Sequence, residues 1–212
     1  SSSRRQRQMC IRDSIISANA EVLQYKGDGN EWTQNIIDQT KHMGKLINQL
    51  LVLAKLDEVQ EKSEKQEADL KLLLEETIEP FEEVATQKKV TLKLHLEEGV
   101  TIRVNREQIA QLVSILTENA AKYVNDGGKI VWRLTKTQHG AVLVVKNTTE
   151  KELPDTKRMF DRFYRSDSSR SSKTGGQGIG LSIAKKIVDS HKGSITAKAG
   201  DGMVTFRVSL PK

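Results

Sequence analysis

The sequence contains a single cysteine, Cys10, so no disulfide can form within the chain. Its neighbours offer no second ligand at metal-binding spacing, and such sparing use of cysteine is typical of a reducing cytoplasm. No apolar run approaches the roughly 18 to 20 residues that a membrane-spanning helix requires, and the first residues are polar and basic, unlike a signal peptide. We therefore expect the chain as given to be cytoplasmic, with any membrane attachment in N-terminal parts missing from it.

Aromatic residues make up only 4% of the sequence, and this scarcity decides how its positive charge is interpreted. A formal net charge of +6 could indicate a nucleic-acid-binding protein. Half of the excess lies within residues 1–14, and the rest is spread over helices of mixed sign and a basic loop, 157–173. Single-stranded nucleic acids are held by basic grooves with interleaved aromatic rings, which this sequence lacks. We therefore expect no nucleic-acid partner.

Residues 1–14 have no hydrophobic period, and their composition differs from that of residues 15–212. The run Arg4 to Ser14 resembles the in-frame translation of an adapter used in DNA sequencing libraries. This resemblance implies an assembly artefact joined to a shortened gene, and such a segment is excluded from fold reasoning. The alternative is a disordered basic terminus that belongs to the protein.

Residues 15–59 show helical spacing in two stretches separated by a glycine-containing turn, 26–30. Apolar residues recur at steps of three and four from Ile15 to Leu23, and again from Glu31 to about Val59. Two helices alone cannot bury so broad an apolar face, because each can cover only one side of the other. We expect a helical hairpin that forms a four-helix bundle as a homodimer, followed by a linker over 60–68.

Residues 69–212 mix helical and strand periods. Helices are expected over 72–88, 107–123 and 179–191, and strands over 90–96, 101–104, 130–135, 141–146, 194–199 and 203–210. The predicted fold class is α+β, in which the hairpin precedes an α/β sandwich with helices on one face of a mostly antiparallel sheet. A polar loop, 148–177, is long enough to suggest a functional role.

A glycine-rich turn opens the helix expected over 179–191, where Gly176, Gly178 and Gly180 alternate with other residues before Leu181. Glycine lets the backbone approach a phosphate closely, and a helix N-terminus offers unpaired N–H groups with partial positive charge. The turn lacks the lysine of a P-loop and the preceding strand of a dinucleotide-binding motif. It indicates an anion site whose ligand depends on the other motifs.

The second motif ends the helix expected over 107–123. Asn119, Lys122 and Tyr123 follow steps of three and four, so Lys122 and Tyr123 each share a face with Asn119. A carboxamide can ligate Mg²⁺, an ammonium can meet phosphate, and a phenol ring can stack on a base. The alternative is an exposed polar helix end.

The third motif is an aromatic and basic cluster inside the polar loop, Phe160 to Arg165. Aromatic rings in a loop need a place to dock, which predicts a lid whose Arg162 and Arg165 reach phosphate oxygens. The alternative is a small hydrophobic staple that anchors the loop without any ligand.

Together the three motifs resemble the histidine kinase catalytic domain of the GHKL (Bergerat) ATPase superfamily over residues 69–212. The resemblance implies that the domain binds ATP and Mg²⁺. In it Asn119 matches the Mg²⁺-binding asparagine of the N box, Lys122 a phosphate-contacting lysine, and Tyr123 the aromatic ring beside adenine. The remaining matches are Phe160 to Tyr164 for the F box, Arg165 for the arginine at the γ-phosphate, and Gly176, Gly178, Ile179, Gly180 and Leu181 for the G2 box.

The chain departs from that family at the adenine-binding position, where Asn147 replaces an aspartate. An asparagine carbonyl can still accept a hydrogen bond, although without the charge assistance that roughly doubles its strength. Ile115 stands where relatives often carry a polar residue. The larger departure is the phosphoacceptor, because no histidine occupies its expected place, residues 9–14, and His42 lies where relatives have arginine.

The resemblance implies a protein-histidine kinase whose intact parent is anchored in the inner or plasma membrane. That parent would phosphorylate a histidine and relay the phosphoryl group to an aspartate in the receiver domain of a response regulator. Because the acceptor is absent, we expect this chain itself not to autophosphorylate. The alternative is a non-catalytic nucleotide-binding scaffold that dimerises.

Overall fold

The structure is a computed structural model that describes residues 16, 22, 23, 25, 33–40, 43, 44, 47, 64–150, 155, 156, 158–162, 164 and 178–212. The chain divides into two compact units, Ser1–Ala54 and Lys55–Lys212. Within the part of the chain that is described, no helix combines the length and apolar character needed to cross a bilayer. The predictions for residues 1–14 and 51–59 lie outside the described residues.

Every described residue of the first unit is helical. Thr33, Ile37 and Thr40 are buried, whereas Ile36 and Met43 remain 48% and 45% exposed. Ile16, Val22 and Leu23 are exposed to a similar extent. The helical prediction for residues 15–59 is therefore confirmed wherever it can be compared, and this unit carries apolar surface that a single chain leaves in water.

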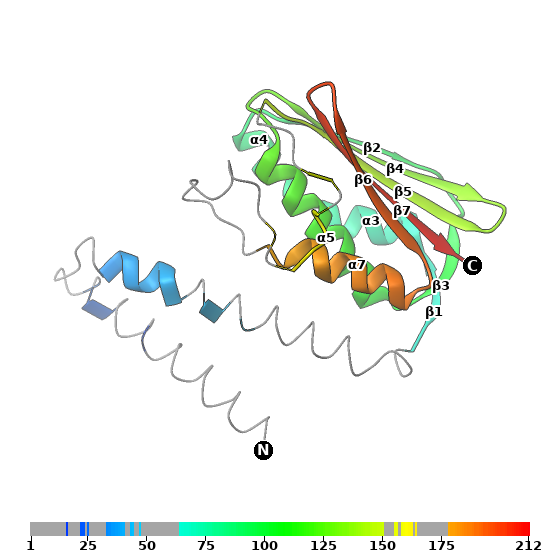
Figure 1. The fold of residues 1–212 in the computed structure, drawn as a ribbon, viewed down its shortest axis with the longest axis horizontal. Coiled ribbons are helices and arrows are strands. Elements are labelled where there is room, and N and C mark those ends of the chain that lie inside the picture. Colours follow the sequence, from blue (N-terminus) through cyan, green and yellow to red (C-terminus); the bar gives the residue numbers. More distant parts are fainter. Residues whose placement is uncertain are drawn as a thin grey trace, which may run out of the picture. The chain divides into compact units, whose positions relative to one another are not determined.

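The second unit is built on a five-stranded sheet (Figure 1). Its strands, in spatial order, are β2 (Thr91–Leu96), β4 (Lys129–Thr137), β5 (Gly140–Thr148), β7 (Met203–Pro211) and β6 (Ser194–Gly200). β2 runs parallel to β4, and all other neighbours are antiparallel. A separate two-stranded sheet pairs β1 (Gln66–Asp69) with β3 (Thr101–Val104). The expected mostly antiparallel sheet is confirmed.

Helices cover one face of this sheet (Figure 1). They are α3 (Leu70–Ile78), α4 (Phe81–Gln87), α5 (Arg106–Tyr123) and α7 (Gly180–Ser190). The core between the two layers combines Trp132 and Phe206 of the sheet with Leu116 and Ile187 of the helices, each at most 1% exposed. Burial of such side chains is the main stabilising term of a two-layer domain, so the predicted α/β sandwich is confirmed.

Asparagine and aspartate side chains set where two helices begin. Asn105 Oδ1 accepts a hydrogen bond from the Gln108 N–H at 2.9 Å at the start of α5. Asp69 Oδ1 accepts from the Lys71 N–H at 2.8 Å at the start of α3. Each cap satisfies a backbone donor that would otherwise lack a partner, so both helices begin at a defined residue.

Two expectations about the start of the second unit were wrong. The single helix expected over 72–88 is two helices, α3 and α4, separated at Glu79 and Pro80. Pro80 has no N–H to donate and its ring clashes with the carbonyl four residues earlier, so a helix cannot pass through it unbroken. The end of the stretch expected to be a linker forms β1, because Ala68 pairs with Ile102 of β3.

Candidate functional site

The end of α5 places the polar residues of the second motif as expected. Asn119, Lys122 and Tyr123 all lie within the helix and are half-buried. The Lys122 ammonium lies 5.2 Å from the centre of the Tyr123 ring, a cation–π distance that holds the two side chains together. The Asn119 carboxamide makes no side-chain hydrogen bond with another described residue, so its oxygen is available to a ligand.

The N-terminus of α7 is open to an anion. Ile179 occupies the cap position, and among the described residues no side chain caps the first N–H groups of the helix. The first turn contains no acidic residue that would compete for its positive end. Gly178 has φ of +71°, a left-handed conformation that favours glycine. This turn therefore has the backbone shape that a phosphate group requires, and its first N–H groups have no side-chain cap within the described part of the chain.

The helices α5 and α7 meet close to both motifs. A side-chain carbon at Gly180 would lie 3.5 Å from Ile115 Cγ2, so the start of α7 packs directly on α5. Ile115 is one helical turn before Asn119. The contact brings the carboxamide of the second motif and the helix N-terminus of the first motif to one region of the domain.

Asn147 lies within β5, because this strand extends two residues beyond the range expected from the sequence. Its side chain is 1% exposed, and its backbone is paired with Ile130 of β4 and Val204 of β7. Nδ2 donates a hydrogen bond to the Thr148 carbonyl at 3.1 Å, which directs the amide group and leaves Oδ1 as an acceptor. An aspartate could not make this bond, since it has no N–H.

Phe160 docks on the sheet. Its ring lies 6.3 Å from that of Phe206 on β7, with an interplanar angle of 78°, the edge-to-face geometry that aromatic pairs prefer. Phe206 is two residues along β7 from Val204, the partner of Asn147, and both Val204 and Phe206 are buried. Phe160 and Asn147 therefore lie beside the same strand, β7, at two successive inward positions, Phe206 and Val204.

Neighbours of Phe160 strengthen this attachment. Met159 is buried, and the Arg158 guanidinium lies 5.2 Å from the centre of the Tyr164 ring. Arg162 is exposed. Gly176 and Arg165 lie outside the described residues, so their predicted places in the site stay predictions.

One contact near the site was not predicted from the sequence. The turn after α5, residues 125–128, places Asn125 Nδ2 at 3.2 Å from Glu150 Oε1, where the long loop begins. A side-chain carbon at Gly128 would lie 2.4 Å from Thr148 Oγ1, so only glycine fits between this turn and β5. The Asn-Asp-Gly-Gly sequence signals the turn, but its contact with Glu150 depends on tertiary structure.

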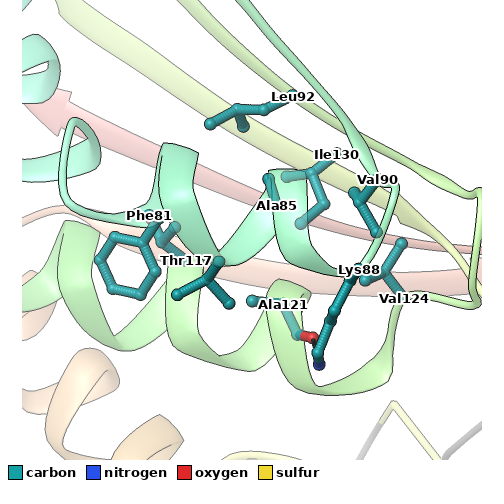
Figure 2. Close-up of a pocket in the computed structure, with 10 residues that line it drawn as sticks. Phe81, Ala85, Lys88, Val90, Leu92, Thr117, Ala121, Val124 and Ile130 are labelled. Carbon is teal, nitrogen blue, oxygen red and sulfur yellow. Dashed lines mark hydrogen bonds between the residues drawn. The ribbon is translucent and has the colours of Figure 1, made fainter.

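An apolar crevice lies between α4, α5 and the strands β2 and β4, on the side of α5 away from Asn119 (Figure 2). It encloses about 10 Å³, which is room for one water molecule at most. Its lining residues are Phe81, Val84, Ala85, Lys88, Val90, Leu92, Thr117, Ala121, Val124 and Ile130. Thr117 and Ala121 occupy the face of α5 opposite Asn119, because successive helical residues are about 100° apart. The crevice is a packing gap on the opposite face of α5 from the candidate site at Asn119.

His191 lies at the C-terminal end of α7. Its ring is 4% exposed and caps α7, with Nδ1 at 2.8 Å from the Ile187 carbonyl. Nε2 accepts a hydrogen bond from the Asn105 N–H at 3.1 Å, which fixes the neutral tautomer with the proton on Nδ1. Burial lowers the pKa of His191, the Ile187 carbonyl raises it, and Lys65 lowers it further. His95 and His139 are exposed, and His42 lies outside the described residues.

Among the described residues, no group of three or more His, Cys, Asp or Glu could hold a metal ion. A cation at this site would therefore depend on the Asn119 oxygen together with oxygens of its own ligand. Mg²⁺ suits that arrangement, because it is commonly bound through one or two protein groups, substrate phosphates and water.

Proteins of known function resemble this chain in sequence and in fold. Residues 104–212 match the family described as histidine kinase-, DNA gyrase B- and HSP90-like ATPase. The sensor protein DltS of Streptococcus agalactiae serotype III (strain NEM316) is 32% identical over 201 residues, which cover 93% of this chain and 50% of DltS. The sensor histidine kinase WalK of Bacillus subtilis (strain 168) is 30% identical over 183 residues, covering 84% of this chain and 30% of WalK.

A solved structure of a histidine kinase catalytic domain is also similar to this chain in fold. The nucleotide-free catalytic domain of the histidine kinase ThkA superposes with a TM-score of 0.63 at 27% identity. The match covers 70% of this chain and 96% of that domain. The chain therefore contains the counterpart of nearly all of that catalytic domain, and it spans about half the length of DltS and less of WalK.

Proposed function

Because this chain belongs to the histidine kinase-, DNA gyrase B- and HSP90-like ATPase family and carries the ATP-binding catalytic portion of a sensor histidine kinase, we propose that its parent transfers phosphate from ATP to a histidine. The parent then passes the phosphoryl group to an aspartate in the receiver domain of a response regulator. Residues 69–212 form the catalytic domain, and residues 15–59 form the dimerisation hairpin.

The observation that carries the proposal is the uncapped N-terminus of α7 behind Gly178. Its unpaired N–H groups donate to the phosphates of ATP, and the helix dipole favours their negative charge. Ile179, Gly180 and Leu181 supply backbone to this cradle. The family resemblance assigns Gly176 to the same phosphate-binding motif. Because Gly180 packs against Ile115 of α5, the cradle is held at a fixed place beside the second motif.

Residues at the end of α5 bind the metal ion and stabilise the negative charge of the phosphates. The Asn119 oxygen is a suitable ligand for Mg²⁺, since it has no side-chain hydrogen bond to another described residue. Bound Mg²⁺ would supply positive charge against the phosphate oxygens. Lys122 adds a cation on the same helix, and Arg165 of the loop adds another at the γ-phosphate. Positioning and charge stabilisation of this kind account for most phosphoryl-transfer catalysis.

The base is held by Asn147 and Tyr123. Asn147 Oδ1 accepts a hydrogen bond from the adenine amino group, since Nδ2 is already directed to Thr148. The Tyr123 ring packs beside the base. Phe160, anchored on Phe206, holds the loop as a lid, and Arg162 on the same loop is exposed and able to reach the phosphates.

A second copy of the chain completes the first unit. Ile16, Val22, Leu23, Ile36 and Met43 are each between 44% and 50% exposed, which is costly for apolar helical residues in a monomer. Pairing two hairpins into a four-helix bundle removes this surface from water. The parent is anchored in the membrane through parts N-terminal to this chain.

Calorimetric titration of the 212-residue chain with ATP tests the nucleotide site. We expect binding in the presence of Mg²⁺ and at least about tenfold weaker binding when the metal is chelated, because Asn119 reaches the phosphates through the cation. Asn119→Ala should weaken binding in Mg²⁺ and reduce the effect of chelation. Gln111→Ala, on the same helix, is the matched control and should leave both measurements unchanged. Absence of binding to the wild-type chain would contradict the proposal.

The absence of an acceptor histidine in residues 9–14 favours a second function. In this alternative the chain is a dimeric scaffold that binds nucleotide without transferring phosphate. ATP binding fits both functions, so only transfer of label from γ-labelled ATP to a histidine separates them.

A further inference from the structure

The outer face of the five-stranded sheet, which is the face away from α3, α5 and α7 (Figure 1), carries cations without anions. Side chains alternate across a strand, so every second residue of each strand points to this face. Its lysines and arginines are Lys93, Lys129, Arg133, Lys146, Lys198 and Arg207, and all six are exposed. No Asp or Glu occurs within any of the five strands. We call this surface the basic sheet face.

The register of the strands distributes these charges evenly. One row across the sheet contains Lys93, Val131, Lys146, Thr205 and Lys198. The next row contains His95, Arg133, Val144, Arg207 and Thr196. Cations separated by one intervening strand lie about 10 Å apart, since neighbouring strands are about 4.8 Å apart. The result is a staggered lattice of positive charge over the whole sheet.

The described part of the chain does not neutralise this lattice. None of the six cations forms an ion pair with another described residue. The acidic residues nearest in the chain are Glu97, Asp126, Glu150 and Asp201, and all four lie outside the strands. Repulsion among six uncompensated like charges weakens folding slightly, so the face has an electrostatic cost that an anionic partner would relieve.

The residue composition of the basic sheet face indicates which class of anionic partner it binds. No Phe, Trp or Tyr stands at an outward position of the five strands, so the surface has no such ring on which nucleic-acid bases could stack. It equally lacks the aromatic anchors on which specific protein interfaces commonly depend. Threonine, serine and valine separate the cations, giving a broad polar surface that meets spread-out charge without a pocket.

We propose that the basic sheet face docks on the surface of an anionic lipid bilayer. Clusters of four to eight Lys and Arg residues bind anionic headgroups electrostatically, and each residue strengthens binding roughly fivefold. Helices α5 and α7 lie on the other face of the sheet, so the nucleotide site stays open to solvent while the sheet is docked. Screening of exposed charges makes the attachment salt-dependent.

Cosedimentation of the full chain with lipid vesicles tests the proposal. One set of vesicles contains about one third phosphatidylglycerol in phosphatidylcholine, and the other contains phosphatidylcholine alone. The test variant combines Lys93→Glu, Arg133→Glu and Lys198→Glu. The control variant reverses three exposed lysines on the helical side, Lys89→Glu, Lys185→Glu and Lys192→Glu. Because residues 1–14 are present in all three proteins, their own basic charge contributes equally to each.

We expect wild-type chain to bind the anionic vesicles and to lose binding as salt rises. The test variant should bind at least about fiftyfold more weakly, and the control variant should stay within about threefold of wild type. An unchanged melting temperature and unchanged Mg-ATP affinity of the test variant show that it is folded. Equal binding to both vesicle types, or equal loss in both variants, would overturn the proposal. So would tighter binding to duplex DNA than to the anionic vesicles at the same salt concentration.

Discussion

At the scale of single residues, the backbone conformation of Gly178 allows a test of its proposed role in phosphate binding. Its φ of +71° costs a side-chain-bearing residue about 1 to 2 kcal/mol. Gly178→Ala is therefore expected to weaken Mg-ATP binding about tenfold, since the turn must rearrange before phosphates can approach. Titration calorimetry measures this effect.

Gly99→Ala is the matched control for that substitution. Gly99 has nearly the same φ, +66°, and a side-chain carbon there would meet no atom within 4 Å. We expect a similar loss of stability from Gly99→Ala and no change in nucleotide affinity. If the two variants bind Mg-ATP equally well, the role of Gly178 at the phosphates is wrong.

Asn147 yields a second prediction, in which affinity and stability move in opposite directions. Asn147→Asp places a charged acceptor at the base and should raise the preference for ATP over GTP about fivefold, because charge-assisted hydrogen bonds are the stronger ones. The same change removes the donor to the Thr148 carbonyl and buries a carboxylate beside it. We expect a loss of about 1 to 3 kcal/mol in the free energy of unfolding.

Competition between ATP and GTP, and chemical denaturation, measure the two effects. Thr148→Ser keeps the backbone carbonyl and serves as a neighbouring control, with both values near wild type. A wild-type preference for ATP equal to or greater than that of Asn147→Asp would contradict the predicted gain in selectivity.

The sequence predicts the surroundings of Asn119 better than those of Asn147. Helical spacing alone places Asn119, Lys122 and Tyr123 together, because their contact is local. The burial of Asn147 depends on pairing with Ile130 and Val204, which are remote in the chain. The packing of Gly180 on Ile115 is likewise a tertiary contact that no local pattern encodes.

At the scale of elements, α7 connects the proposed phosphate-binding turn to His191. Because the folded pKa of His191 is lowered, the folded state keeps the ring neutral while the unfolded chain takes up a proton below about pH 6.5. The stabilisation is therefore present above that pH and is lost as the pH falls towards the folded pKa. We expect the melting temperature to fall between about pH 7.5 and about pH 5.5, a window that brackets the unfolded pKa.

Two variants isolate the contribution of His191. His191→Gln should be less stable at about pH 7.5, by about 1 to 2 kcal/mol, since it loses the bond from the Asn105 N–H. It should also lose part of the pH dependence. His139→Gln, at an exposed turn, should retain the full dependence. Identical pH profiles for wild type and His191→Gln would contradict this role of the buried ring.

The boundaries of the helices and strands show which sequence patterns were sufficient to predict them. Alternating apolar residues predicted the six strands from β2 onward to within about two residues, because a buried face imposes that period. The break between α3 and α4 was missed although Pro80 is visible, since apolar spacing continues across it. Strand β1 contains a single apolar residue, Ala68, so it shows no alternation, and its pairing with β3 defines it.

At the scale of the whole molecule, we expect the 212-residue chain not to autophosphorylate. In-line transfer needs a neutral imidazole beside a group that fixes its tautomer and takes its proton. His191 is buried and both of its ring nitrogens are occupied, while His95 and His139 belong to the sheet and its hairpin turn. Incubation with γ-labelled ATP should therefore leave the chain unlabelled even though it binds nucleotide.

Two further proteins make that labelling experiment decisive. A chain extended by a helix with a His-Glu pair before Ile15 should become labelled, which would identify the parent as a kinase. An extended chain that binds ATP and stays unlabelled would favour the scaffold. Acid-labile label on the unmodified chain, abolished by His42→Ala, would show that the acceptor is His42.

The parallel pairing of β2 with β4 also bears on the order in which the domain assembles. The β4–β5 and β6–β7 hairpins join strands that are neighbours in the chain, so they form early at little loop-closure cost. β2 reaches β4 only after residues 97–128, including α5, have crossed over the sheet. It is also an edge strand with one partner. Its amides should exchange with solvent deuterium sooner than those of β5, which makes β2 the first strand released when the domain opens and the last one to return.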